Sequence, residues 1–211
     1  PVGDETADKL IKKLIPRVEA LKIGPYTSGE DVDFGPVITA ASKANIENLV
    51  QTGIDQGASL VVDGRGFKLQ GYEDGFFVGA HLFDNVTTDM DIYKKEIFGP
   101  VLSTVRAKTY EEAIQMAIDH EYGNGTSIFT RDGDTARDFS NRINIGMVGV
   151  NVPIPVPLAY HTFGGWKKSM FGDLNQHGPD AFKFFTRTKT ITSRWPSGIK
   201  EGGEFSIPVM E

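Results

Sequence analysis

KKEIFGPVLSTVRAKTYEEAIQMAI, residues 94–118, is the stretch that decides the class of fold. Its middle, VLSTVRA, is rich in apolar and β-branched residues, as is typical of a strand. Thr109 and Glu112 then have the spacing of a capping box, which marks the first turn of a helix. Apolar residues share one face of that helix: Ala113, Ile114, Ala117 and Ile118. A strand followed at once by an amphipathic helix indicates an α/β fold.

The same alternation extends in both directions along the chain. Further helices are predicted at residues 7–21, 41–57 and 134–143. Further strands are predicted at residues 58–64, 76–83, 125–130 and 147–152. The strand at 58–64 is expected to be short and buried, Pro16 is expected to kink the first helix, and Gly123-Asn124-Gly125 is interpreted as a turn. We therefore expect an α/β protein with a mostly parallel sheet and flanking helices.

Composition and charge exclude several classes of protein. The chain has 211 residues, 39% apolar and 24% charged, which is ordinary for a soluble globular domain. Its net charge is −6, with 22 Lys and Arg against 28 Asp and Glu, and no basic block could neutralise a phosphate backbone. No apolar run approaches the roughly 20 residues that cross a bilayer, and the N-terminus lacks a signal-peptide pattern. We expect a cytoplasmic protein that binds neither nucleic acid nor membrane.

Few residues are of the types that most often act as nucleophiles or metal ligands. Cysteine is absent, which fits a reducing compartment and removes any cysteine nucleophile or thiolate metal site from these residues. The four histidines are scattered without metal-ligand spacing, so no metal site is predicted: His81, His120, His161 and His177. The chain starts at Pro1 without an initiator Met, so we expect it to be a fragment of a longer protein.

The C-terminal end has a different pattern. From Lys183 to Trp195, KFFTRTKTITSRW alternates with period 2 but carries polar residues on both faces. Such a strand needs a partner edge, in another subunit or in a sheet outside this chain. We expect a main domain over 1–182, a pairing strand over 183–196 and a loosely tied tail over 197–211.

Two candidate features allow more than one interpretation. Glu96 could be a carboxylate that simply faces water and Phe98 a ring that fills the core, or both could belong to a site. The segment Pro153–Pro157 could be a polyproline ligand, but it follows a predicted strand, which favours a rigid ordered loop. Loops at the carboxyl ends of strands are where α/β proteins place their sites.

A set of short motifs carries a family resemblance. In chain order they are EIFGP, YGNGTSIFT, VGVNVPIP, FGGWKKS, FGDLNQHG and KTITSRW. They resemble the C-terminal part of the aldehyde dehydrogenase superfamily, and most of all its acylating methylmalonate-semialdehyde subgroup. The resemblance implies that a dinucleotide-binding domain and the catalytic cysteine lie N-terminal of Pro1, so the chain alone is expected to be inactive. One departure is Met170, where many members have Gly after the serine, and Gly172 is expected to supply the bend.

The resemblance also implies roles for individual residues. Glu96 accepts hydrogen bonds from the hydroxyls of the nicotinamide ribose of NAD, and Phe98 packs beside the nicotinamide. A carboxylate suits that role because its two oxygens can accept from both hydroxyls. Phe163 lines the aldehyde pocket, and Asn151 with the proline loop shapes the same mouth. Lys183–Trp195 is implied to be the strand that joins subunits of a homo-oligomer, a dimer or tetramer.

The resemblance leaves the final acceptor of the acyl group open. In the acylating subgroup, coenzyme A releases the acyl product of a small semialdehyde, whereas an ordinary aldehyde dehydrogenase uses water. A third alternative is a non-catalytic interaction module, if the chain is naturally this short. The choice of NAD over NADP comes from the resemblance alone.

Overall fold

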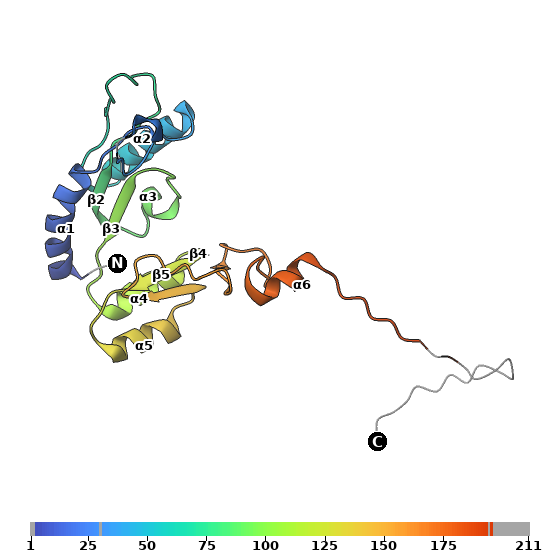
Figure 1. Ribbon diagram of the computed structural model, residues 1–211. Helices are drawn as coiled ribbons and strands as arrows, with labels where there is room; N and C mark the ends of the chain where they lie inside the picture. Colours follow the sequence, from blue (N-terminus) through green and yellow to red (C-terminus); the bar gives the residue numbers. More distant parts are fainter. Residues whose placement is uncertain (1–2, 30, 194, 196–211) are drawn as a thin grey trace.

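The computed structural model describes residues 3–29, 31–193 and 195 (Figure 1). Its helices are α1 (Asp4–Glu19), α2 (Ala40–Asp55), α3 (Asp91–Lys94), α4 (Tyr110–Asp119), α5 (Gly133–Arg142) and α6 (Ala181–Phe185), with 3-10 turns η1 (Tyr26–Ser28) and η2 (Gly178–Asp180). Its strands are β1 (Ser59–Val62), β2 (His81–Val86), β3 (Val101–Val105), β4 (Tyr122–Gly123), β5 (Gly125–Ile128), β6 (Met147–Val150) and β7 (Trp166–Lys167). The predicted alternation of strands and helices is confirmed.

The expected mostly parallel sheet is wrong. In the described part of the chain the strands form three small sheets, ordered β1-β2-β3, β4-β7 and β5-β6. The β2–β3 and β5–β6 pairs are parallel, but β1–β2 and β4–β7 are antiparallel. Apolar runs indicate where a strand lies, but its direction relative to a neighbour depends on hydrogen bonds between distant segments. The sheets are therefore mixed, and the predicted turn at residues 123–125 instead links two short strands.

The first sheet also differs in detail from the prediction. The residues of β1 are exposed or half-buried because β1 is an edge strand in this sheet, so the expected buried strand is wrong. β2 begins at His81, five residues later than predicted. Before it, Gly64 and Gly79 lie in backbone contact, and a Cβ on Gly79 would lie 2.4 Å from the Gly64 oxygen. The two backbone segments are too close at this point for residues with a side chain.

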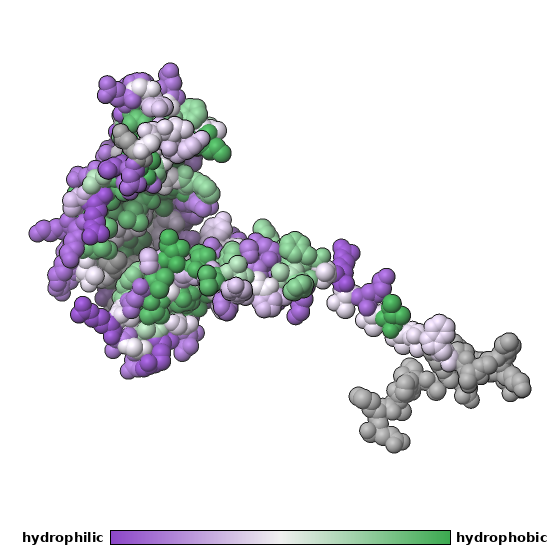
Figure 2. Space-filling view, viewed as in Figure 1, coloured by the Kyte–Doolittle hydropathy of each residue, from purple (hydrophilic) through white to green (hydrophobic). Residues whose placement is uncertain are grey.

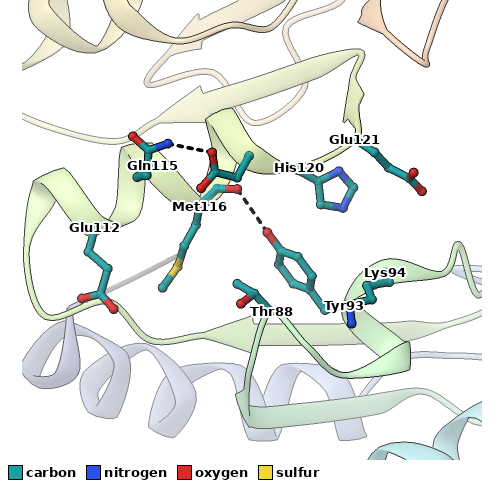
Figure 3. Close-up of a pocket in the computed structure, with 9 residues that line it drawn as sticks. Thr88, Tyr93, Lys94, Glu112, Gln115, Met116, His120 and Glu121 are labelled. Carbon is teal, nitrogen blue, oxygen red and sulfur yellow. Dashed lines mark hydrogen bonds between the residues drawn. The ribbon is translucent and has the colours of Figure 1, made fainter.

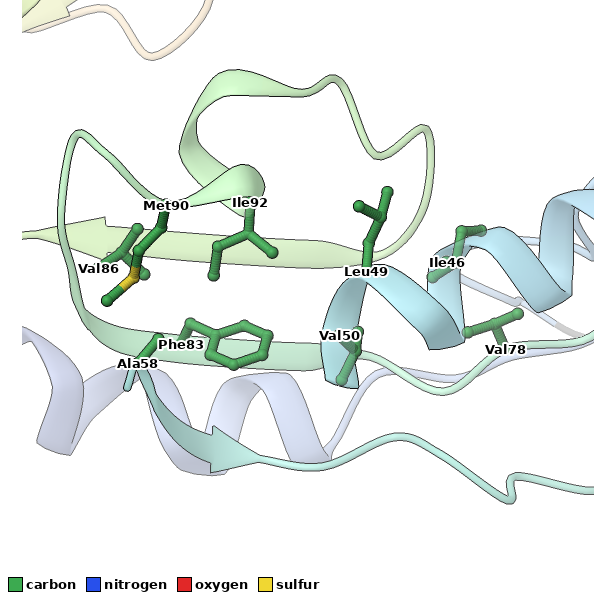
Figure 4. Packing of buried hydrophobic residues seen from close by; sticks show 9 residues of the cluster. All are labelled: Ile46, Leu49, Val50, Ala58, Val78, Phe83, Val86, Met90 and Ile92. Atoms are coloured by element: carbon green, nitrogen blue, oxygen red, sulfur yellow. The ribbon is translucent and has the colours of Figure 1, made fainter. Parts of the chain in front are cut away.

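Two apolar clusters hold the elements together. The larger one gathers around α2, β2 and α3 (Figure 4) and contains Ile46, Leu49, Val50, Ala58, Val78, Phe83, Val86, Met90 and Ile92. The smaller one gathers around α4 and α5 and contains Ile114, Phe139, Ile143 and Ile145. Half of the predicted capping box is present at the start of α4, where Thr109 Oγ1 accepts from the Glu112 backbone N–H at 3.1 Å. The Glu112 carboxylate accepts from the backbone N–H of Lys108, at 2.7 Å, in place of that of Thr109.

The C-terminal part differs most from the prediction. Figures 1 and 2 show α6 and the segment after it projecting away from the rest of the molecule. Because Lys183 lies within α6, the predicted strand is wrong in its first residues. Residues 186–193 pair with no other strand among the described residues. Pairing across a subunit boundary stays a prediction, and the predicted tail over 197–211 lies outside the described residues. None of the helices in the described ranges has the length and apolar character needed to span a membrane.

Candidate functional site

The loop that follows α3 presents two side chains to the outside. The Lys95 backbone N–H donates to the Asp91 carbonyl at 2.8 Å, which closes the helix before the loop begins. Ile97 then packs against the larger apolar cluster, whereas Glu96 and Phe98 on either side of it are exposed. The Phe98 residue is 81% exposed. The interpretation of Phe98 as a core ring is therefore wrong, since Ile97 takes that place.

The loop is held in a specific and unfavourable conformation. Phe98 has a φ of +55°, in the left-handed region that costs a residue with a Cβ roughly 1–2 kcal/mol. Directly after it, Gly99 lies against Ile46, and the Pro100 carbonyl accepts from the His81 backbone N–H at 2.8 Å. Strain of this kind persists only where surrounding contacts impose it, and it concentrates at functional sites.

Glu96 lies beside a pocket and has free acceptors. Among the described residues its carboxylate forms no hydrogen bond and no salt bridge. The pocket has a volume of about 520 Å³ and is lined by Tyr93, Lys94, Lys95, Glu96, His120, Tyr122, Asn124 and Ser169. Glu96 and Phe98 also line a smaller hollow of about 320 Å³, together with Ile92 and Ser103. Both oxygens of Glu96 are thus available to a hydrogen-bond donor.

A second pocket of about 510 Å³ lies between α3 and α4 (Figure 3). Tyr93 forms a wall common to both pockets, and its hydroxyl donates to the Met116 carbonyl at 3.2 Å. Burial raises the pKa of Tyr93. The His120 ring stands edge-on to it with centroids 5.2 Å apart. The sequence analysis missed Tyr93 and His120 as lining residues, because only the fold brings α3 to the end of α4.

The FGGWKKS motif joins the same region by close backbone packing. A Cβ on Gly165 would lie 3.1 Å from the Asn124 Cα, and Ser169 Oγ accepts from the Gly123 backbone N–H at 3.0 Å. Ser169 and Asn124 therefore line the pocket beside Glu96. Farther on, Gly172 has a φ of +77°, so the predicted bend is confirmed.

Lys167, from the same motif, closes the end of α4. Its Nζ donates to the carbonyls of Ala117, Ile118 and His120 at 3.0, 2.7 and 2.9 Å. The last carbonyls of a helix have no partners within the helix, and a cation satisfies them well. Burial lowers the pKa of Lys167. No local pattern signals this role, because the two segments are far apart in the sequence.

Asn151 lies at the carboxyl end of β6, and its side chain is engaged in the fold. Its Oδ1 accepts from the Thr130 backbone N–H at 2.9 Å, and its Nδ2 donates to the Thr130 carbonyl at 3.0 Å. This double contact ties the end of β6 to the segment after β5. In the proline loop that follows, Pro155 packs against Gly149, which agrees with an ordered loop. The loop still exposes Val152, Ile154, Val156 and Leu158.

Phe163 is the first residue of the FGG motif, whereas Gly165, its last residue, packs against Asn124 beside the pocket. It stacks on His177, with ring centroids 4.0 Å apart and planes 27° apart. Neither Phe163 nor Asn151 is among the residues that line the pocket beside Glu96. The structure thus places Glu96 and Phe98 together on one loop and the other two predicted residues on separate segments. No group of three His, Asp or Glu residues in the described ranges is arranged to hold a metal ion.

Comparisons with known proteins identify the family of the chain. The profile of the aldehyde dehydrogenase family matches residues 2–191. A malonate-semialdehyde dehydrogenase of Pseudomonas aeruginosa is 58% identical over 208 residues, which are 98% of this chain and 42% of the relative. A crystal structure from Sinorhizobium meliloti 1021, complexed with NAD and assigned as a methylmalonate-semialdehyde dehydrogenase, matches with a TM-score of 0.88 and 71% identity, over 95% of this chain and 41% of that one. A methylmalonate-semialdehyde dehydrogenase from Oceanimonas doudoroffii matches with a TM-score of 0.87 and 52% identity, over 93% and 40%.

The matches cover nearly all of this chain but only part of each relative. The chain spans about two-fifths of the length of the relatives, whereas the relatives cover nearly all of the chain. The matched family profile takes in every motif around the pocket, from the Glu96 loop to the FGGWKKS segment. The chain belongs to the aldehyde dehydrogenase family.

Proposed function

We propose that this chain is part of an NAD-dependent, coenzyme A-acylating semialdehyde dehydrogenase, in which Glu96 orients the cofactor. The observation that carries the proposal is the Glu96 carboxylate, which has no partner among the described residues and stands on a loop anchored to the core. A charged group left free at a pocket edge, next to an exposed ring in a strained conformation, has no evident structural purpose.

The residues present fit the cofactor. The two Glu96 oxygens can accept from both ribose hydroxyls, and such charge-assisted pairs fix orientation as well as adding affinity. Phe98 offers an exposed face for the nicotinamide, a contact worth about 0.5–1.5 kcal/mol. NAD, when bound, supplies the acceptor of the hydride from the substrate. The chain contains no cysteine and so supplies no thiol nucleophile. Its proposed role is to orient the cofactor. The expected position of the catalytic cysteine N-terminal of Pro1 stays a prediction, which the reading frame upstream tests.

The names of the relatives support a proposal for the substrate class. They are named for malonate semialdehyde and methylmalonate semialdehyde, so we propose a short semialdehyde that carries a carboxylate. Phe163 and Asn151 are proposed to shape the aldehyde pocket, Asn151 by holding the start of the proline loop through Thr130. We further propose coenzyme A as the acyl acceptor and the cytoplasm as the location.

A conservative substitution tests the role of Glu96. In the gene product that contains this chain, Glu96→Gln should lower the efficiency of hydride transfer about 10- to 100-fold, because the amide has no negative charge and only one acceptor oxygen in place of two. Glu19→Gln, at an exposed site near the end of α1, is the matched control and should retain the rate. An unchanged rate for Glu96→Gln together with a large loss of thermal stability would show that Glu96 serves the fold instead.

Product analysis tests the acyl acceptor. The same full-length protein is supplied with NAD and a short carboxylated semialdehyde, with and without coenzyme A. The acylating proposal expects an acyl-coenzyme A product and much slower turnover in its absence. Equal turnover without coenzyme A, with only the free acid formed, would replace it with the hydrolytic alternative.

A further inference from the structure

His81 is buried without hydrogen-bond partners for its ring. It is the first residue of β2 and is 1% exposed. Neither Nδ1 nor Nε2 has a hydrogen-bond partner among the described residues. The nearest carboxylate oxygen, Asp63 Oδ1, is 3.9 Å from Nε2, too far for a hydrogen bond. Buried polar atoms are nearly always paired, so this exception calls for an explanation.

The charged groups that face the ring hold each other instead. Asp63 and Arg65 both lie in the segment after β1, and the Arg65 Nη2 donates to Asp63 Oδ2 at 2.6 Å. Arg65 is fixed in turn by Gln51, whose Oε1 accepts from Nη1 at 2.7 Å. The carbonyls of Pro100 and Gly79 also face the ring and favour its charged form, although neither is in position to accept a hydrogen bond from it. Burial lowers the pKa of His81, and the Asp63 charge opposes that change only in part.

The backbone of His81 is tied to the loop that carries Glu96. Its N–H donates to the Pro100 carbonyl at 2.8 Å, and His81 pairs with Val101 across the β2–β3 ladder. Pro100 is the last residue of the loop. Gly79, two residues before His81, is already in backbone contact with Gly64. Because no acceptor is in hydrogen-bonding position, a charged ring at this site gains a hydrogen-bond partner or water only when the ring and the start of β2 shift.

We propose that His81 is a proton-sensitive positioning residue for the Glu96 loop. Protonation of the buried ring displaces the start of β2, breaks the hydrogen bond from His81 to Pro100 and loosens residues 95–100. The ring is neutral when the loop is ordered. The consequence for NAD, weaker binding in mild acid, rests on the proposed function, whereas the movement of the loop does not.

Hydrogen exchange measured by mass spectrometry tests the movement without any ligand. The gene product that contains this chain is compared at about pH 7.5 and about pH 5.5, the range in which histidine titrates, with labelling times scaled for intrinsic exchange. Peptides covering 79–86 and 95–103 should lose protection at the lower pH, by at most about tenfold per pH unit since one proton is bound. A peptide from α5, residues 133–142, is the internal control and should not change.

Three variants sharpen the test. His81→Gln should abolish the pH response of the two peptides, whereas His161→Gln, at an exposed site, should leave it as in the wild type. Asp63→Asn should move the response to lower pH, because the carboxylate favours the protonated ring. Circular dichroism establishes that each variant is folded.

Protection of the two peptides that is equal at both pH values in the wild type would overturn the proposal, and this result needs no variant to fold. A pH response that survives in folded His81→Gln would overturn it as well. A parallel NAD titration separates the two proposals. If NAD fails to bind at either pH while the exchange response is present, the cofactor role of Glu96 falls and the His81 inference stands.

Discussion

Gly99 lies directly against Ile46, so that a Cβ atom on Gly99 would be only 2.6 Å from the Ile46 Cδ1. Ile46 is 1% exposed and belongs to the larger apolar cluster. The contact joins the loop of Glu96 and Phe98 to the core. It explains why glycine follows the aromatic residue of the EIFGP motif, since a side chain would separate the loop from α2.

Gly99→Ala should therefore damage both the fold and the site. The added methyl group overpacks the contact with Ile46, and we expect a loss of about 1–3 kcal/mol in the free energy of unfolding by urea titration. Binding of NAD should weaken as well, because Phe98 and Glu96 move with the loop. Gly133→Ala is the control, since the nearest atom there is the flexible end of Arg137 at 3.4 Å. Equal stability of the two variants would contradict the packing argument.

Lys167→Met should destabilise the end of α4. Methionine keeps most of the apolar stem but leaves the carbonyls of Ala117, Ile118 and His120 without their donor. We expect a loss of about 1.5–3 kcal/mol, the range for hydrogen bonds to a charged group, measured by thermal or urea unfolding. The neighbouring Lys168→Met removes only an exposed pair with Glu121 and should change stability little. The prediction fails if the two lysine variants cannot be told apart.

Stability should fall as the pH is lowered through the range of histidine. The pKa of His81 is lowered from its ordinary 6.5 in the folded protein, so below about pH 6.5 the unfolded chain binds the proton that the folded chain resists. His81 therefore stabilises the fold fully above that pH and loses this contribution as the pH falls toward its folded pKa. The slope should not exceed about 1.4 kcal/mol per pH unit for one group.

Urea titrations across that range check the prediction, and His81→Gln should flatten the curve. Asp63 and Asp84, whose pKa values are lowered by hydrogen bonds from Arg65 and Arg106, add a further loss only at more acidic pH. A wild-type curve that is already flat between about pH 7.5 and about pH 5.5 would contradict the role assigned to His81.

Removal of the C-terminal segment tests the proposed subunit contact. Truncation after Phe185 keeps α6 intact and deletes the polar, alternating residues that follow. If these residues pair with a second copy, light scattering should show a smaller species while circular dichroism retains most of the helical signal. An unchanged molecular mass would place the contact elsewhere.

The sequence by itself was sufficient for the four longer helices, α1, α2, α4 and α5, and for the residues of the loop that carries Glu96, but not for the short helices α3 and α6. The bounds of α2, α4 and α5 lie within two residues of those predicted, because apolar spacing and end caps such as Thr109 act within one or two turns. The motifs around Glu96 and Phe163 were also enough to indicate the family, which the comparisons confirm. These are local signals, carried by residues close together in the chain.

The tertiary structure decided everything that depends on distant segments meeting. Four features have no local signature in the sequence: the antiparallel direction of β1, the exposure of Phe98, the Lys167 contact with α4 and the burial of His81. Asn151 illustrates the difference. Its motif predicts a loop at a strand end, but only the fold shows that its side-chain amide is hydrogen-bonded to the backbone of Thr130. The physical reason is that burial and hydrogen bonding are satisfied between whichever groups the chain brings together, and spacing along the sequence does not specify those partners.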